Sequence, residues 1–394
     1  MSGTRALGLL WLLAACGGSG ERPIDGGGGE TSPPTCMPPS PLCGASCGNN
    51  VVDTCWLPLM PGGNHCTFYS QPEVCDGSTD KTCEQVGYYG GTLACTSCRL
   101  DATDCDACPP ASQCGAFAPL EIDRGIAVSG SRVAVAGYNE IAVFEGLTQI
   151  ARPMIPEIYD ITAVPGGWIA VHGSPPVLTT IGTDGVVGTT YPMFENAALS
   201  TIAYASGRVL FVWRGVSASG DTHLYFVITD LTGDVVVPEI DVMPVFGQYI
   251  QLTSDGASFF LAADGKLVRI ATDGTHTSVT TSVSYSKFIT WSGSTGYLAS
   301  QTAAQRFDAN GTLVGPPITL GGNPADFLAD GGDLLVLSSG FKTTIDRIDA
   351  TGATVASTEV GAGPSSDAFL ARLGSEVFVA WSLPARLQVA IVAP

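Results

Sequence analysis

The sequence contains few charged residues, and basic residues are the scarcest among them. Only 13% of its 394 residues are charged, and 17 Lys and Arg stand against 36 Asp and Glu, which gives a net charge of −19. The basic residues are scattered, so no basic patch is available to hold phosphates, and the negative field repels a polyanion. The composition therefore excludes nucleic acid as a partner.

The chain also lacks an apolar run long enough to cross a bilayer, which takes about 20 residues. Its apolar stretch at residues 6–15 follows Arg5 and ends in the small residues Ala14 and Ala15, directly before Cys16. A short apolar run with a small-residue end is typical of a cleaved signal peptide. We therefore expect residues 1–15 to be a signal peptide.

The residues Leu13-Ala14-Ala15-Cys16 resemble the lipobox of bacterial lipoproteins. The resemblance implies that Cys16 is lipidated and becomes the mature N-terminus, so that acyl chains anchor the protein to a membrane. Gly17 is not the Asp that marks inner-membrane retention in that family, which implies an outer-membrane or cell-surface location, on the periplasmic or extracellular face. An ordinary secretory signal peptide is the alternative.

Cysteine is absent after residue 114, and the segment before it is rich in cysteine. Residues 16–35 are a Gly/Pro-rich linker with no apolar periodicity, which predicts a disordered tether. Residues 36–114 then hold twelve of the thirteen cysteines, and an even count in an exported segment with few apolar residues predicts a disulfide framework. These cysteines are Cys36, Cys43, Cys47, Cys55, Cys66, Cys75, Cys83, Cys95, Cys98, Cys105, Cys108 and Cys114.

A zinc site is the alternative for the last part of this segment. Cys95 and Cys98, and then Cys105 and Cys108, have the two-plus-two spacing of zinc ligands. The gap between the pairs is short for a zinc ribbon, and export favours oxidation, so we expect disulfides there. The pairing itself cannot be deduced from the spacing.

About sixty residues of this segment resemble a cysteine-rich repeat of exported proteins from myxobacteria and their relatives. The resemblance implies an extracellular or periplasmic structural module without an active site. The sequence departs from that repeat between Asp53 and Glu73, where Cys55 and Cys66 lie in an insertion. The matching residues are 47–53, 73–77, 82–83, 90–95, 98 and 104–105, and the run Gly90-Gly91-Thr92-Leu93-Ala94-Cys95 is the most specific of them.

The remaining chain, residues 115–394, repeats with a period near forty residues. The 49 Gly and 26 Pro of the sequence favour turns over helices. Each repeat contains an alternating apolar run, a glycine turn and a second apolar run, and most contain a further Asp/Gly turn between strands. Four strands at this period predict a seven-bladed β-propeller; six or eight blades and tandem β-sandwiches are the alternatives. The turn glycines are Gly130, Gly167, Gly207, Gly256, Gly293, Gly332 and Gly374.

The two ends of this region predict how the ring closes. The last repeat has three expected strands, at 368–373, 376–381 and 387–392, and lacks a fourth. Residues 117–122 precede the first repeat and are expected to be a leftover strand. Pairing this strand with the last blade removes two exposed sheet edges.

Few residues point to chemistry, and no catalytic residue can be named. The four histidines lie in different segments, and nucleophile-elbow, phosphate-loop and His-Glu-x-x-His motifs are absent. Asp123, Asp160 and Asp367 lie seven residues before turn glycines, at one end of the expected channel, where Ca²⁺ is a conceivable ligand. Turn capping by these Asp residues is the favoured alternative, and we expect no cofactor.

The loops at the same end contain aromatic and polar residues suited to recognition. We predict ligand binding by Tyr138, His172, Trp213, Arg214 and Trp381, although packing between blades is the alternative for the tryptophans. We expect a monomeric lipoprotein that presents the propeller to an unknown protein or glycan. The competing hypothesis is an enzyme, a lyase or glycan hydrolase, acting at the channel mouth.

Overall fold

The computed structural model describes most of the chain from residue 75 onward. Cys16, the linker and the cysteines before Cys75 lie outside the described residues, as does Cys98. The described part falls into two units, Met1–Val86 with Gly90–Cys105, and Gly87–Tyr89 with Asp106–Pro394. The described residues are 75, 79, 81–86, 88–96, 99–109, 113–193, 198–217, 219–247, 249–283, 286–321, 324–339, 342–362, 367–383 and 386–393.

The first unit is a small disulfide-bonded element. Its described part has a 3₁₀ turn, η1 (Glu84–Val86), and the antiparallel strands β1 (Gly91–Thr96) and β2 (Arg99–Cys105). Disulfides join Cys75 to Cys95 and Cys83 to Cys105, while a third bridge, Cys108–Cys114, belongs to the second unit. Disulfides are thus confirmed for these six cysteines. The zinc alternative is wrong, because three of its four ligands are bridged to other cysteines.

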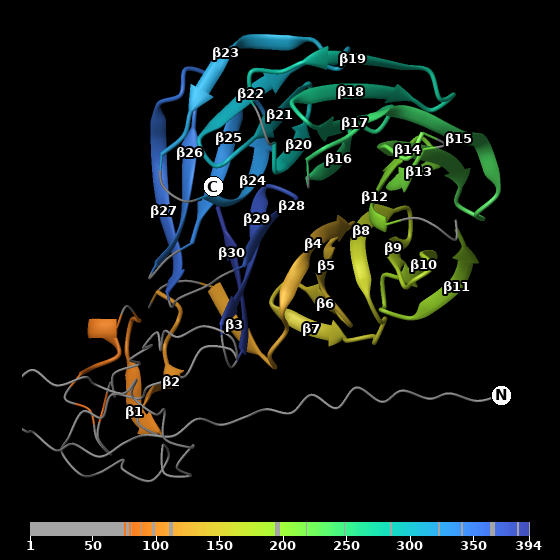
Figure 1. Cartoon of the computed structure of the whole chain (residues 1–394). Coiled ribbons are helices and arrows are strands. Elements are labelled where there is room, and N and C mark those ends of the chain that lie inside the picture. The colour runs from red at the N-terminus through yellow and green to blue at the C-terminus, as the bar shows by residue number, and fades with distance from the viewer. Residues whose placement is uncertain are drawn as a thin grey trace, which may run out of the picture. The chain divides into compact units, whose positions relative to one another are not determined.

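The second unit is an all-β propeller of seven four-stranded antiparallel sheets (Figure 1). The seven-bladed fold is therefore confirmed. Among the described residues, no helix is long and apolar enough to cross a membrane. From the inner to the outer strand, the blades are β4 (Ile122–Ser129), β5 (Arg132–Gly137), β6 (Ile141–Glu145) and β7 (Thr148–Ala151); β8 (Ile158–Val164), β9 (Gly167–His172), β10 (Val177–Gly182) and β11 (Val187–Pro192); β12 (Ala198–Ala205), β13 (Arg208–Val216), β14 (Thr222–Asp230) and β15 (Val235–Pro244); β16 (Ile250–Ser254), β17 (Ser258–Ala263), β18 (Lys266–Ala271) and β19 (His276–Thr280); β20 (Phe288–Ser292), β21 (Thr295–Ala299), β22 (Ala303–Phe307) and β23 (Leu313–Thr319); β24 (Pro324–Asp330), β25 (Asp333–Ser338), β26 (Lys342–Ile348) and β27 (Thr354–Ala362); and β28 (Ala368–Leu373), β29 (Glu376–Leu383), β30 (Arg386–Val392) and β3 (Gln113–Phe117).

Burial follows the order of strands within each blade. All six residues of β17 and four of the six residues of β25 are buried, because a second strand packs against the neighbouring blade on both faces. Outer strands carry exposed polar residues, as in β11 and β19. The apolar core therefore lies between adjacent blades, in clusters shared by two sheets.

The inner strands form the wall of a central channel. Each of them contacts the inner strand of the next blade around the ring, and β28 of the last blade contacts β4 of the first. We call the end of the ring where the inner strands begin the entry face. The loops between the second and third strands, and those leading into each inner strand, lie on this face.

The ring closes as predicted, but with a different segment of chain. β3 pairs with β30 from Gln113↔Ile391 to Phe117↔Leu387, and the expected strand at 117–122 is wrong for all but Phe117. Pro119, which has no N–H to donate, lies just beyond the end of β3, where the chain turns toward β4. Phe117 packs edge-on against Phe144 of the first blade at 5.0 Å between ring centroids. The closing strand thus also seals the junction between the last blade and the first.

Candidate functional site

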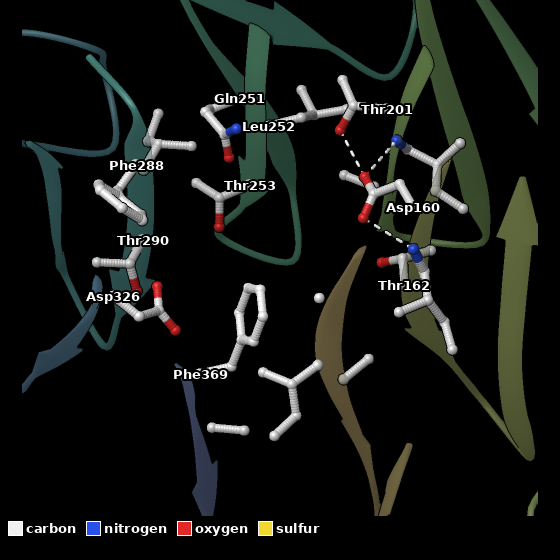
Figure 2. A pocket seen from close by; sticks show the side chains of 18 of the residues that line it. Asp160, Thr162, Thr201, Gln251, Leu252, Thr253, Phe288, Thr290, Asp326 and Phe369 are labelled. Carbon is white, nitrogen blue, oxygen red and sulfur yellow. Dashed lines mark hydrogen bonds between the residues drawn. The ribbon is translucent and has the colours of Figure 1, made fainter. Parts of the chain in front are cut away.

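A cavity of about 880 Å³ occupies the channel, and all seven inner strands line it (Figure 2). Each inner strand is hydrogen-bonded to a strand of its own blade on one side only, so its other edge faces the cavity. Polar residues alternate with apolar ones along this wall. Gln251 and Thr253 come from β16, and Phe369 comes from β28.

Two carboxylates are the most strongly perturbed groups in the wall. Asp160 accepts hydrogen bonds from Thr201 Oγ1 at 2.5 Å and from the backbone N–H of Ile202 at 3.0 Å, both in the next blade. Asp326 likewise accepts from the N–H of Leu370 in the next blade at 2.7 Å. Desolvation raises the pKa of Asp160 to about 6 and that of Asp326 to about 7, against the effect of these hydrogen bonds. Both side chains therefore tie neighbouring blades together at the cavity surface.

The structure gives no support to the less favoured calcium interpretation of Asp123, Asp160 and Asp367. Among the residues that the structure describes, no group of three His, Cys, Asp or Glu side chains is placed to hold a metal ion. Asp160 is already occupied by its donors, and Asp123 forms an ion pair with Arg124 at 3.2 Å. Burial raises the pKa of Asp123, and the charges of Glu121 and Asp367 add to this rise, while Arg124 opposes it. The three carboxylates therefore do not form one oxygen cage.

The two tryptophans predicted to bind a ligand at the mouth are instead packed between neighbouring blades. Trp213 is 3% exposed and stacks between Phe211 and Tyr225, with ring centroids 5.3 and 5.9 Å away. Trp381 is fully buried against Gly361, where a Cβ atom would lie 2.2 Å from the indole. The packing alternative is therefore correct for both indoles, and their predicted role in ligand binding is wrong.

His172 is also an internal contact. Its Nε2 lies 2.7 Å from Thr179 Oγ1, which is in turn 2.8 Å from Thr190 Oγ1 on the outer strand. Burial lowers the pKa of the imidazole, so the neutral form is favoured. This contact links the strands of blade two and accounts for the ring without a ligand, while binding by His172 stays a prediction.

Tyr138 and Arg214 remain candidates for ligand binding. Tyr138 is 39% exposed, and the guanidinium of Arg124, which lines the cavity, lies 5.1 Å above its ring. The Nε and Nη2 atoms of Arg214 are buried and have no hydrogen-bond partner among the described residues. Binding by these two residues stays a prediction.

Sequence reasoning missed an exposed apolar patch at the tip of blade three. Val216 at the end of β13 is 75% exposed, and Phe246 in the loop after β15 is 91% exposed. Val216 pairs with Thr222, whose carbonyl accepts a hydrogen bond from Val245 N–H, so the two apolar residues belong to the same end of the blade. We call Val216 and Phe246 the rim patch. The connection between β13 and β14 is longer than the equivalent connection in other blades, which is a signal for this region, but nothing in the sequence singles out Phe246.

The loop that carries Phe246 is held in place by its backbone. Phe246 N–H and Gly247 N–H both donate to the Asp264 carboxylate, at 2.5 and 2.8 Å. Asp264 itself lies at the entry face of blade four, in the left-handed region with φ of 47°. The phenyl ring is therefore displayed on an ordered support rather than on a free loop.

No protein-family model matches the sequence, and no curated protein sequence matches it significantly. Solved structures do resemble the fold. The Pan2 WD40 domain of Neurospora crassa superposes with a TM-score of 0.53 at 13% identity, covering 72% of this chain and 95% of that one. Hsv2 of Kluyveromyces marxianus gives 0.51 at 10% identity, covering 67% and 90%. At these identities the likeness shows the propeller fold alone.

Proposed function

We propose that this chain is a non-enzymatic lipoprotein, anchored through Cys16, whose propeller binds a protein partner at the rim patch. The observation that carries the proposal is Phe246, a large apolar side chain that is 91% exposed on a fixed loop. Phe is among the aromatic residues enriched at protein interfaces, and a fixed backbone lowers the entropic cost of docking. Anchoring by lipid would keep the protein in the same compartment as such a partner.

The proposal is tested by comparing matched surface variants. The double variant Val216→Ser/Phe246→Ala removes the rim patch, while Val355→Ser removes an exposed apolar side chain from the outer strand of blade six. We expect wild type and Val355→Ser to capture the same protein from detergent-solubilised native membranes, and the rim variant to lose at least about tenfold in affinity for it. Equal capture by the rim variant, with an unchanged melting temperature, would refute this placement of the interface.

An enzyme remains the second candidate, because Asp160 and Asp326 line one cavity and both have a raised pKa. A glycan hydrolase would use one such carboxyl as an acid and another as a base or nucleophile. The backbone donors bound to each carboxylate account for both residues without catalysis, so binding is the favoured function. Release of reducing ends from a polysaccharide by wild type, but not by Asp160→Asn/Asp326→Asn, would establish the enzyme instead.

A further inference from the structure

We infer that the channel cavity is a second binding site, separate from the rim patch, and that it takes a neutral oligosaccharide. Its volume of about 880 Å³ lies within the range of roughly 300–1,000 Å³ that small-molecule sites occupy. The rim residues Val216 and Phe246 do not line it. The two sites can therefore be tested independently.

The wall of the cavity offers unpaired hydrogen-bonding groups. Gln251 and Thr253 lie two residues apart on β16, so both side chains project from the same face of the strand (Figure 2). Neither of them, nor the side chain of Thr162, makes a hydrogen bond to any residue in the described part of the chain. The free edges of the inner strands add backbone N–H and C=O groups. The cavity thus combines donors and acceptors that no protein group uses.

Aromatic faces stand beside these polar groups. Phe288 and Phe369 line the same cavity, and Figure 2 shows the Phe369 ring between Asp326 and Asp160 in that view. Phe288 is held edge-on against Phe327 at 4.8 Å between centroids. A sugar ring has apolar C–H faces that pack on such rings, and hydroxyls that both donate and accept hydrogen bonds. The aromatic rings of the wall can pack against the C–H faces of a sugar, and its unpaired polar side chains can form hydrogen bonds with the hydroxyls.

The charges of the wall favour a neutral ligand over an anionic one. Its three cations are dispersed: Arg124 is paired with Asp123, Arg372 with Asp330, and Lys287 lies over the ring of Tyr249 at 4.9 Å. The wall holds three carboxylates, Asp123, Asp160 and Asp326, beside these three cations, so it offers no surplus of positive charge to a phosphate or uronate, and the net charge of −19 of the chain further disfavours an anion. The two carboxylates already accept backbone hydrogen bonds, which leaves little to attract a cation.

A peptide would bind mainly along one free strand edge. The unpaired side chains of this cavity instead come from different strands, β8 and β16, which belong to different blades. Hydroxyl groups that point in several directions from a sugar ring suit this arrangement better than an extended backbone. The expected ligand is therefore a short neutral saccharide.

Calorimetric titration with maltotriose, cellotriose, chitotriose and mannotriose tests the inference on the full, disulfide-bonded protein. We expect at least one of them to bind, and Gln251→Ala/Thr253→Val to weaken that binding by roughly tenfold or more through the loss of direct hydrogen bonds. Thr277→Val, on an exposed outer strand, is the matched control for the threonine change and should bind as wild type does. The rim variant Val216→Ser/Phe246→Ala should also bind the saccharide normally.

Several outcomes would overturn the inference. These are no binding of any of the four trisaccharides at millimolar concentration, equal binding by the folded cavity variant, or binding of a neutral tripeptide in their place. Loss of protein capture by the rim variant with intact saccharide binding supports both sites. Intact capture by that variant, together with cavity-dependent saccharide binding, overturns the rim proposal alone.

Discussion

At the scale of single residues, two carboxylates of the channel wall join neighbouring blades of the propeller. Asp160 and Asp326 occupy equivalent places, each opposite a residue of the second strand just after an irregularity in register. Each accepts a backbone N–H of the next inner strand. These bonds join blade two to blade three and blade six to blade seven, at the cost of desolvating the carboxyl groups.

This cost predicts a pH dependence of stability at Asp326. Its pKa is about 7 in the folded protein and about 3.9 in an unfolded chain, so the folded state holds the proton more tightly. The stabilisation is complete below the unfolded value and is lost as pH rises through about 7. Asp326→Asn keeps an oxygen acceptor and removes this titration. We therefore expect its melting temperature, relative to wild type, to rise between about pH 5 and pH 8.

Asp349→Asn is the matched variant, and its stability relative to wild type should change with pH in the opposite direction. The hydroxyl and N–H of Thr351 donate to Asp349 and lower its pKa, so Asp349→Asn should lose stability relative to wild type at neutral pH. That loss should shrink as pH falls below the ordinary Asp value. A constant difference between Asp326→Asn and wild type across the pH range would contradict the raised pKa.

Residue-level predictions succeeded where composition determines the outcome and failed where the exposure of a side chain determines it. Cysteine pairing as disulfides was predictable because composition and export determine it. The burial of Trp213 was not, because strand ends in blade three extend beyond those of other blades, and periodicity does not reveal how far. Phe246 carries no periodic signal at all, since its exposure depends on the hydrogen bonds that Asp264 makes to its loop.

At the scale of elements, the Asp/Gly turns between the third and fourth strands of blades two to six pack against the preceding blade. In one of them, Asp273 Oδ1 accepts from the N–H and hydroxyl of Thr275 at 2.9 and 2.7 Å. Gly274 follows with φ of 86°, and a Cβ there would lie 2.6 Å from Val237 of the preceding blade. The glycine is thus required both by its backbone angle and by the close approach of another sheet.

These two requirements can be separated by substitution. Gly256 has the same φ of 86° and also follows an Asp, but no atom lies within 4 Å of the point that a Cβ there would occupy. Gly256→Ala should cost about 1–2 kcal/mol of unfolding free energy for its left-handed backbone. Gly274→Ala should cost about 1–3 kcal/mol more, because the methyl group meets Val237. Equal losses in chemical denaturation would show that the approach of the blades imposes no constraint.

Hairpins were predictable from alternation and turn glycines, but their exact register was not. Gly130 lies inside the turn between Ser129 and Arg132, whereas Gly167 already pairs with Val164 at the start of a strand. A fixed count of seven residues back from the turn glycine therefore reaches a different position on the inner strand in different blades. For this reason the count reached Asp160 but missed Asp326 by one residue.

At the scale of the whole molecule, the first strand of the propeller completes its last blade. β3 contains Cys114, which is bridged to Cys108, and it directly precedes the chain that enters β4. Ala362 N–H at the end of β27 donates to Ala107 O at 2.8 Å, next to the same disulfide. The number of blades was predictable from the repeat, but the closing strand was not, because its residues resemble the cysteine-rich segment before them.

The proposed anchor predicts how the whole protein partitions. Wild type should incorporate an alkyne-labelled fatty acid and sediment with membranes, because several acyl chains hold it there. Cys16→Ser should lose the label and appear in the soluble exported fraction. A Cys16→Ser protein that still sediments with membranes would show that something other than lipid retains it.

Ring closure underlies both the cavity and the rim patch, and hydrogen exchange of the intact, oxidised protein measures it most directly. We predict that the amides of residues 113–117 that donate to β30 exchange far more slowly than amides of an unfolded chain, since the two strands share one hydrogen-bonded ladder. Rapid exchange at 113–117, with 386–392 still protected, would contradict closure of the ring by β3.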